Sequence, residues 1–86
     1  MKLTILSPDK EIFDGEVTSV KVPGSAGSFE LLNNHAPIVS SLNPGVVRVK
    51  TAKETFSFEV DKGFIEMLNN EISLLVQGYA PIKGDD

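Results

Sequence analysis

Hydrophobic residues recur at every second position along this chain, in short runs that turn residues separate. Such alternation is typical of strands that bury one face. β-Branched residues are frequent in the runs, which favours an extended backbone. The pattern therefore predicts an all-β domain whose core is formed by these alternating positions. The clearest runs are Leu3-Ile5, Val20-Val22, Val47-Val49, Phe56-Phe58-Val60, Ile65-Met67 and Ile72-Leu74-Val76.

Gly, Pro, Asn and Asp residues stand between these runs and supply the backbone conformations that turns need. Asn69-Asn70 separates two alternating runs, which predicts a tight antiparallel hairpin. Residues 51–54 are predicted to form another turn. Residues 36–42 are predicted to be extended, because their proline, valine and serines disfavour a helix. Short strands with frequent turns predict an antiparallel β-sandwich or a small barrel.

The length of 86 residues allows one domain with a thin margin of stability. The chain has no cysteine, which excludes disulfides and thiolate metal sites. Its single histidine cannot build a histidine-based metal site without carboxylate ligands. We therefore expect no metal and no cofactor, and a fold that depends on its core or on a partner.

The charge balance argues against nucleic acid as a partner. The chain has 8 basic and 12 acidic residues and a formal net charge of −4, and its basic residues are scattered. It contains no apolar stretch of about 20 residues, so we expect no direct membrane insertion. The amino-terminal run is too short and too polar for a signal peptide, which makes a cytosolic location the default expectation. The polar end, residues 83–86, is predicted to fray.

One segment of the chain is nearly free of charge. Between Gly24 and Gly45 the only charged side chain is Glu30, and the single histidine, His35, lies in the same segment. The centres of protein interfaces are depleted in charged residues. Residues 24–34 hold too many small polar side chains for a core, whereas residues 36–42 are apolar enough to reach it. This segment is therefore interpreted as part core and part docking surface.

No arrangement of residues predicts catalysis. His35 could act as a base toward nearby serines, but none of them stands in a G-x-S-x-G turn. Glu59 and Asp61 could face the same side of a strand, although scattered acids of this kind usually serve solvation. The glycines at 23–28 lack the G-K-[ST] ending of a phosphate-binding loop. We therefore expect a protein that is not an enzyme.

The ordered set of motifs in this segment resembles the amino-terminal β-sandwich of the epsilon subunit of ATP synthase, the subunit called delta in mitochondria. Similar flanking patterns at 12–17 and 63–75 extend the resemblance over residues 3–80. The positions that carry it are Pro23-Gly24-Ser25, Gly27, Phe29, His35-Ala36-Pro37, Leu42 and Pro44-Gly45.

The resemblance implies a ten-stranded sandwich in the central stalk of a rotary proton-translocating ATP synthase. In that family the sandwich binds the gamma subunit and rests on the polar loops of the c-ring. It has no catalytic residue, and it couples rotation to ATP synthesis. The implied location is the cytoplasmic face of the bacterial inner membrane, as a peripheral subunit. A free-standing ligand- or peptide-binding sandwich is the alternative, although the chain has no Trp and one Tyr to form an aromatic platform.

The resemblance also implies partner-binding residues. The loop that meets the c-ring is matched by Gly24, Ser25, Ala26, Gly27 and Ser28. A docking loop beside it, near gamma and the ring, is matched by Glu30, His35, Ala36 and Pro37.

The chain departs from the family pattern at three places. Glu30 stands where the family usually has glycine, and Asn33-Asn34 stand where it has Pro-Gly. Asparagine tolerates the positive φ of a turn glycine, so the shape of the loop is expected to survive. Asp61-Lys62-Gly63 lacks the usual double glycine. Most members continue into a helical hairpin that regulates hydrolysis. We expect this chain to be a short form without it, and a natural short form rather than a truncated one because it has its own Met1.

Overall fold

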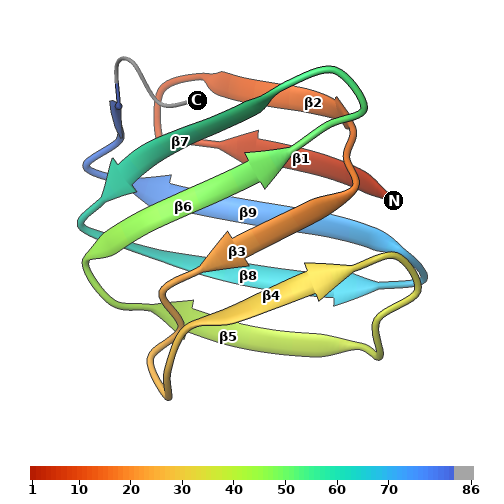
Figure 1. Cartoon of the computed structure of the whole chain (residues 1–86). Coiled ribbons are helices and arrows are strands. Elements are labelled where there is room, and N and C mark those ends of the chain that lie inside the picture. Colours follow the sequence, from red (N-terminus) through yellow and green to blue (C-terminus); the bar gives the residue numbers. More distant parts are fainter. Residues whose placement is uncertain (83–86) are drawn as a thin grey trace.

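Ten short strands pass back and forth between two facing layers (Figure 1). The computed structural model describes residues 1–82, and the predicted fraying of 83–86 lies outside the described residues. The strands are β1 (Lys2–Leu6), β2 (Glu11–Glu16), β3 (Ser19–Val22), β4 (Phe29–Leu32), β5 (Ile38–Leu42), β6 (Gly45–Lys50), β7 (Thr55–Val60), β8 (Lys62–Leu68), β9 (Glu71–Gln77) and β10 (Ala80–Pro81).

The layers are two five-stranded sheets. Sheet I has the order β2-β1-β9-β8-β5, and sheet II has the order β10-β7-β6-β3-β4. This arrangement confirms the predicted ten-stranded sandwich. One pair differs from the expected antiparallel pattern, because β1 lies parallel to β9, from Lys2 opposite Glu71 to Leu6 opposite Leu75. Every other strand pair is antiparallel.

The core lies between the sheets and follows the period of two. In β9 the residues alternate between exposed and buried along the whole strand, and β8 alternates from its third residue to its end. The predicted core positions are buried, except that Phe56 is half-buried. Val17, Leu31, Leu42 and Met1 complete the buried cluster.

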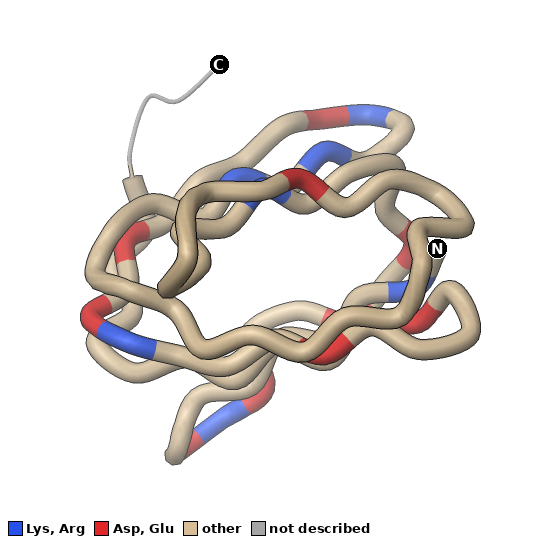
Figure 2. Tube along the Cα trace, turned by 90° about the horizontal axis from the view of Figure 1, so that it is seen from below, with Lys and Arg blue, Asp and Glu red and all other residues tan. Residues whose placement is uncertain are grey.

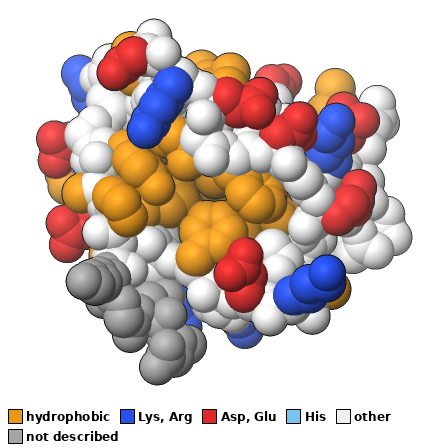
Figure 3. Space-filling view, turned by 90° about the horizontal axis from the view of Figure 1, so that it is seen from above, with side chains coloured by type: hydrophobic (Ala, Val, Ile, Leu, Met, Phe, Trp, Pro, Cys, Tyr) orange, Lys and Arg blue, Asp and Glu red, His pale blue; other side chains and the backbone are white. Residues whose placement is uncertain are grey.

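Aromatic side chains close the sandwich between β2 and β7. Phe13 of β2 lies 5.3 Å from Phe56 of β7, measured between ring centroids. Phe58 continues the series to Tyr79 at 5.0 Å. Figure 3 shows hydrophobic side chains gathered in a hollow on this side, with charged residues around it. Large rings therefore fill the space where β10, with two residues, covers little of the core.

The turns at 51–54 and 69–70 follow the sequence-based predictions, whereas Asp14-Gly15 and Lys62-Gly63, which have turn-type residues, lie inside β2 and β8. Asn69 and Asn70 both have positive φ, 54° and 63°, as a tight two-residue hairpin between β8 and β9 requires. At the 51–54 turn, Thr51 N–H donates to Glu54 O at 2.8 Å. Residues 38–42 are extended as β5, as predicted.

Charged residues are spread over both layers rather than gathered on one face (Figure 2). The described residues form strands and turns, and no helix among residues 1–82 is long and apolar enough to cross a membrane.

Candidate functional site

The β3–β4 loop, residues 24–28, links the two sheets at one end of the sandwich. Gly24 forms an isolated bridge with Leu42 of β5, which belongs to the other sheet. Ser25 N–H donates to Ser41 O at 2.9 Å, and the Ser41 hydroxyl donates to the Ser25 hydroxyl at 3.1 Å. Residues 25–28 are exposed. The loop is therefore anchored at its base and free at its tip, as a docking loop must be.

Two glycines give this loop its shape. A Cβ on Gly24 would lie 2.6 Å from Phe29 Cε2 and 2.7 Å from Gly27 O, so no side chain fits there. Gly27 has φ +127°, a conformation that residues with side chains rarely adopt. The glycines are therefore explained by the turn itself.

The β4–β5 loop, residues 33–37, lies at the opposite end of β4 (Figure 1). β4 begins after the β3–β4 loop and ends before the β4–β5 loop, and its four residues span about 13 Å. The expectation that the two loops lie beside each other is therefore wrong, because a strand separates them. Residues 33–37 are all exposed.

His35 has a defined orientation within this loop. Its backbone N–H donates to Leu32 O at 3.0 Å, and its Nδ1–H donates to Ala36 O at 2.7 Å. A carbonyl oxygen can only accept, so this contact assigns the proton to Nδ1. Nε2 is then the ring nitrogen that is left to contact a group outside the chain. Within residues 1–82 the hydrogen bond of the ring joins it to the carbonyl of its neighbour and not to a serine hydroxyl, so the geometry does not assemble a hydrolytic triad.

The departures from the family pattern fit the fold. Asn34 has φ +64°, so it takes the place of a turn glycine as expected. Glu30, which was grouped with the docking loop, lies inside β4 with its side chain exposed and opposite Lys21 of β3. The carboxylate therefore faces solvent across from a lysine and does not disturb the core.

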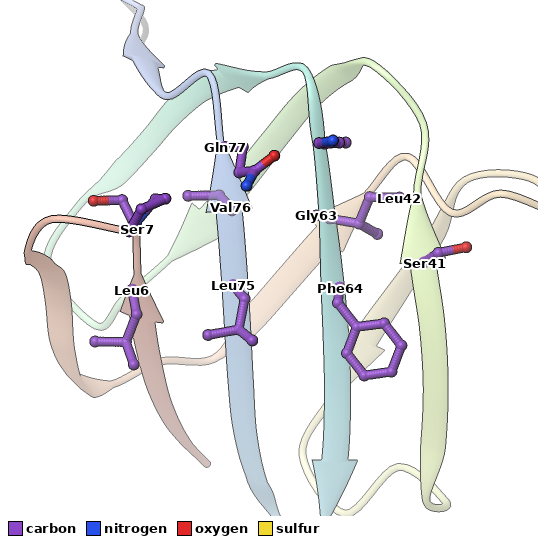
Figure 4. A pocket seen from close by; sticks show the side chains of 11 residues that line it. Leu6, Ser7, Ser41, Leu42, Gly63, Phe64, Leu75, Val76 and Gln77 are labelled. Atoms are coloured by element: carbon purple, nitrogen blue, oxygen red, sulfur yellow. The ribbon is translucent and has the colours of Figure 1, made fainter.

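An apolar row on the outer face of sheet I is the feature that the sequence analysis missed. Leu6 of β1, Leu75 of β9 and Phe64 of β8 are direct cross-strand neighbours. They lie side by side on three adjacent strands (Figure 4), and are 37%, 48% and 43% exposed. These three side chains, called the apolar row below, are therefore not covered by any other part of residues 1–82.

The apolar row lies along an open groove of about 520 Å³. Eleven residues line the groove, and Lys62 is the only charged one. Ser41 lines it as well and binds Ser25, so the groove and the β3–β4 loop form one continuous surface. The β4–β5 loop lies at the other end of the same strands.

A signal for the apolar row was present in the sequence. Leu6 follows Ile5, Phe64 precedes Ile65, and Leu75 stands between Leu74 and Val76. Each pair breaks the alternation by placing an apolar residue at an outward position. Such breaks in neighbouring strands mark a contact surface once the strand order is known.

This surface is suited to bind a partner by burying its apolar side chains. No group of His, Cys, Asp or Glu side chains within residues 1–82 is arranged to hold a metal ion. Covering the three apolar side chains would stabilise a complex at about 25 cal/mol for each Å² removed from water. The arrangement therefore suits a protein partner with a complementary apolar face.

The family model and the curated relatives that match this chain all belong to one family. Residues 1–81 match the family model described as ATP synthase, Delta/Epsilon chain, beta-sandwich domain. The ATP synthase epsilon chain of Leptospira interrogans serovar copenhageni is 40% identical over 85 residues, which is 99% of this chain and 66% of that protein. The chloroplastic ATP synthase epsilon chain of Cyanidioschyzon merolae is 41% identical over 78 residues, 91% of this chain and 60% of that protein. The chain thus spans at most 66% of the length of these two relatives.

Two solved structures share the fold. A chain in the cryo-EM structure of the Euglena gracilis mitochondrial ATP synthase, OSCP/F1/c-ring in rotational state 1, matches with a TM-score of 0.87 and 21% identity, covering 98% of this chain and 54% of that chain. A chain in the Tetrahymena thermophila mitochondrial ATP synthase central stalk and c-ring matches with a TM-score of 0.78 and 18% identity, covering 92% of this chain and 64% of that chain.

Proposed function

The chain belongs to the ATP synthase delta/epsilon family, with residues 1–81 as its β-sandwich domain, and from this premise we propose that it is a non-catalytic subunit of a rotary ATP synthase central stalk. In this role it binds the gamma subunit and the c-ring and couples rotation to ATP synthesis. It acts as a peripheral subunit, on the cytoplasmic face of the inner membrane if the source is bacterial. The observation that carries the proposal beyond family membership is the uncovered apolar row.

The apolar row is proposed to receive the gamma subunit. Leu6, Phe64 and Leu75 form a contiguous apolar surface with one charge, Lys62, in the adjoining groove. Depletion of charge at the centre and polar groups at the rim are the properties of a protein interface. The β4–β5 loop, with Nε2 of His35, is proposed to add a polar contact to gamma at the far end of the same sheet.

The β3–β4 loop is proposed to contact the polar loops of the c-ring. Its exposed tip holds Ser25, Ala26, Gly27 and Ser28, which carry no charge and offer hydroxyl and backbone groups. Because the loop continues into the groove through Ser41, one end of the sandwich can contact gamma and the ring at once.

Binding to purified gamma subunit tests the role of the apolar row. In Leu75→Glu a carboxylate is placed at the centre of the row, where a partner would have to remove it from water. We expect the dissociation constant for gamma to rise more than about tenfold, which corresponds to about 1.4 kcal/mol. Isothermal titration calorimetry with the isolated chain measures it.

Val46→Glu is the matched control, because Val46 is 46% exposed and lies on β6 of the other sheet. It should bind gamma within about twofold of the wild-type chain. Equal affinity of Leu75→Glu and Val46→Glu would assign gamma to another surface. Failure of the wild-type chain to bind gamma at micromolar concentration would contradict the proposed function itself.

Site-specific crosslinking tests the contact with the c-ring. The chain has no cysteine, so Ala26→Cys places a single thiol at the tip of the β3–β4 loop. Ala52→Cys is the control, because Ala52 lies beside Met1 and Asn33 at the other end of the sandwich. In the assembled complex a short thiol-directed photocrosslinker should join c subunits to position 26 and not to position 52. Crosslinks of equal yield from both positions would contradict the assignment.

A further inference from the structure

The β4–β5 loop is tied to the other sheet by one side chain, Asn70. Asn34 N–H donates to Asn70 Oδ1 at 2.7 Å, and Asn70 Nδ2 donates to Asn33 Oδ1 at 3.0 Å. Asn33 Oδ1 also accepts from the Met1 amino group at 3.1 Å. Asn70 belongs to the β8–β9 turn of sheet I, whereas the loop leaves sheet II at the end of β4. The loop is thus bonded to an element that is distant in sequence.

Burial does not hold this loop in place. Residues 32–37 are all exposed, and the nearest buried side chain on the amino-terminal side is Leu31. Because no buried side chain anchors this loop, its conformation depends on its hydrogen bonds. The loop is therefore held by the Asn70 amide, which contacts both Asn33 and Asn34, together with the Met1 amino group on Asn33.

We propose that Asn70 is a positioning residue that holds the β4–β5 loop in the conformation in which it meets the gamma subunit. The proposal rests on the proposed function for its partner, and on the hydrogen bonds for its mechanism. A loop that is already ordered loses less conformational entropy when it binds. Asn70 acts without touching the partner, because it fixes Asn34 and thereby the direction of His35.

The turn alone does not explain an asparagine side chain at position 70. Its φ of +63° is open to glycine as well, and glycine would form the same two-residue hairpin. Asn69, with φ +54°, lies in the same turn, and the hydrogen bonds between the turn and the β4–β5 loop come from Asn70 and not from Asn69. Asn70→Gly therefore removes the amide and keeps the turn, and Asn69→Gly makes the same chemical change without touching the loop.

Amide hydrogen exchange of the isolated chain, followed by NMR, directly measures how strongly Asn70 protects the Asn34 amide in the loop. In Asn70→Gly we expect the Asn34 amide to exchange about fivefold to tenfold faster than in the wild-type chain, because it loses its acceptor. Asn69→Gly should leave this rate within about twofold. Asn70→Asp keeps an acceptor oxygen and tolerates the same backbone conformation, so it should retain most of the protection.

Dissociation from immobilised gamma subunit gives the second readout, which a purely structural role would not change. The dissociation rate from gamma should be several-fold higher for Asn70→Gly than for Asn69→Gly. The core amides of both variants should be equally protected from exchange. Equal Asn34 exchange in the two glycine variants, or Asn70→Asp exchanging as fast as Asn70→Gly, would overturn the proposal. Faster exchange with unchanged dissociation would overturn its functional half. If the wild-type chain does not bind gamma, the proposed function fails, and the exchange rates still decide whether Asn70 holds the loop.

Discussion

At the scale of single residues, two phenylalanines have different roles: one stabilises the fold and the other is exposed for binding. Phe58 is 1% exposed and packs in the core beside Tyr79, whereas Phe64 is 43% exposed in the apolar row. They are six residues apart in the chain, and Phe58 lies on the inner face of sheet II whereas Phe64 lies on the outer face of sheet I. A phenylalanine therefore stabilises the fold at position 58, whereas at position 64 it is available for contact with a partner.

Truncation of each phenylalanine to alanine tests this division. Phe58→Ala should lower the free energy of unfolding by about 3–5 kcal/mol, since it leaves a cavity in the core. Phe64→Ala should lower it by less than about 1 kcal/mol, because it removes exposed surface. Urea denaturation followed by far-ultraviolet circular dichroism measures both values. Similar losses in the two variants would mean that the row supports the fold rather than an interface.

At the scale of elements, the β8–β9 hairpin depends on two residues with positive φ. Asn69→Ala should destabilise the chain by about 1 kcal/mol, because alanine is strained in the left-handed conformation. Asn69→Gly should stay within about 0.5 kcal/mol of the wild-type value, since glycine adopts it freely. The same denaturation experiment compares the two. An alanine variant as stable as the glycine variant would show that the turn can change its type.

The sequence predicts elements better than it predicts their neighbours. The alternation places the core residues of β8 and β9, and the asparagine pair places the hairpin between them, because both signals are local. The pairing of β1 with β9 has no local signal, since residues 2–6 alternate in the same way beside any strand. The apolar row could not be predicted from the sequence for the same reason, because Leu6 and Leu75 become neighbours only through that pairing. The separation of the two candidate loops likewise depends on β4 being a strand.

At the scale of the whole molecule, the sandwich presents different surfaces at its two ends. One end carries the β3–β4 loop and the groove, bonded together through Ser25 and Ser41. The other carries the β4–β5 loop, held by Asn70. Sheet I connects the two ends along its outer face. A partner that lies along this face can therefore touch the apolar row and the His35 loop while leaving the β3–β4 loop free for a second partner.

The position of β9 also sets the order in which the protein can be completed during synthesis. β9 is the central strand of sheet I, between β1 and β8, although it follows both of them in the chain. Until residue 77 has emerged, β1 has β2 on one side and an edge of unpaired backbone N–H and C=O groups on the other. In a nascent chain β1 and β8 therefore lack their common neighbour until residue 77 has emerged, and pairings this distant in sequence close slowly. Until β9 pairs with them, the open edges of β1 and β8 favour pairing with other chains and hence aggregation.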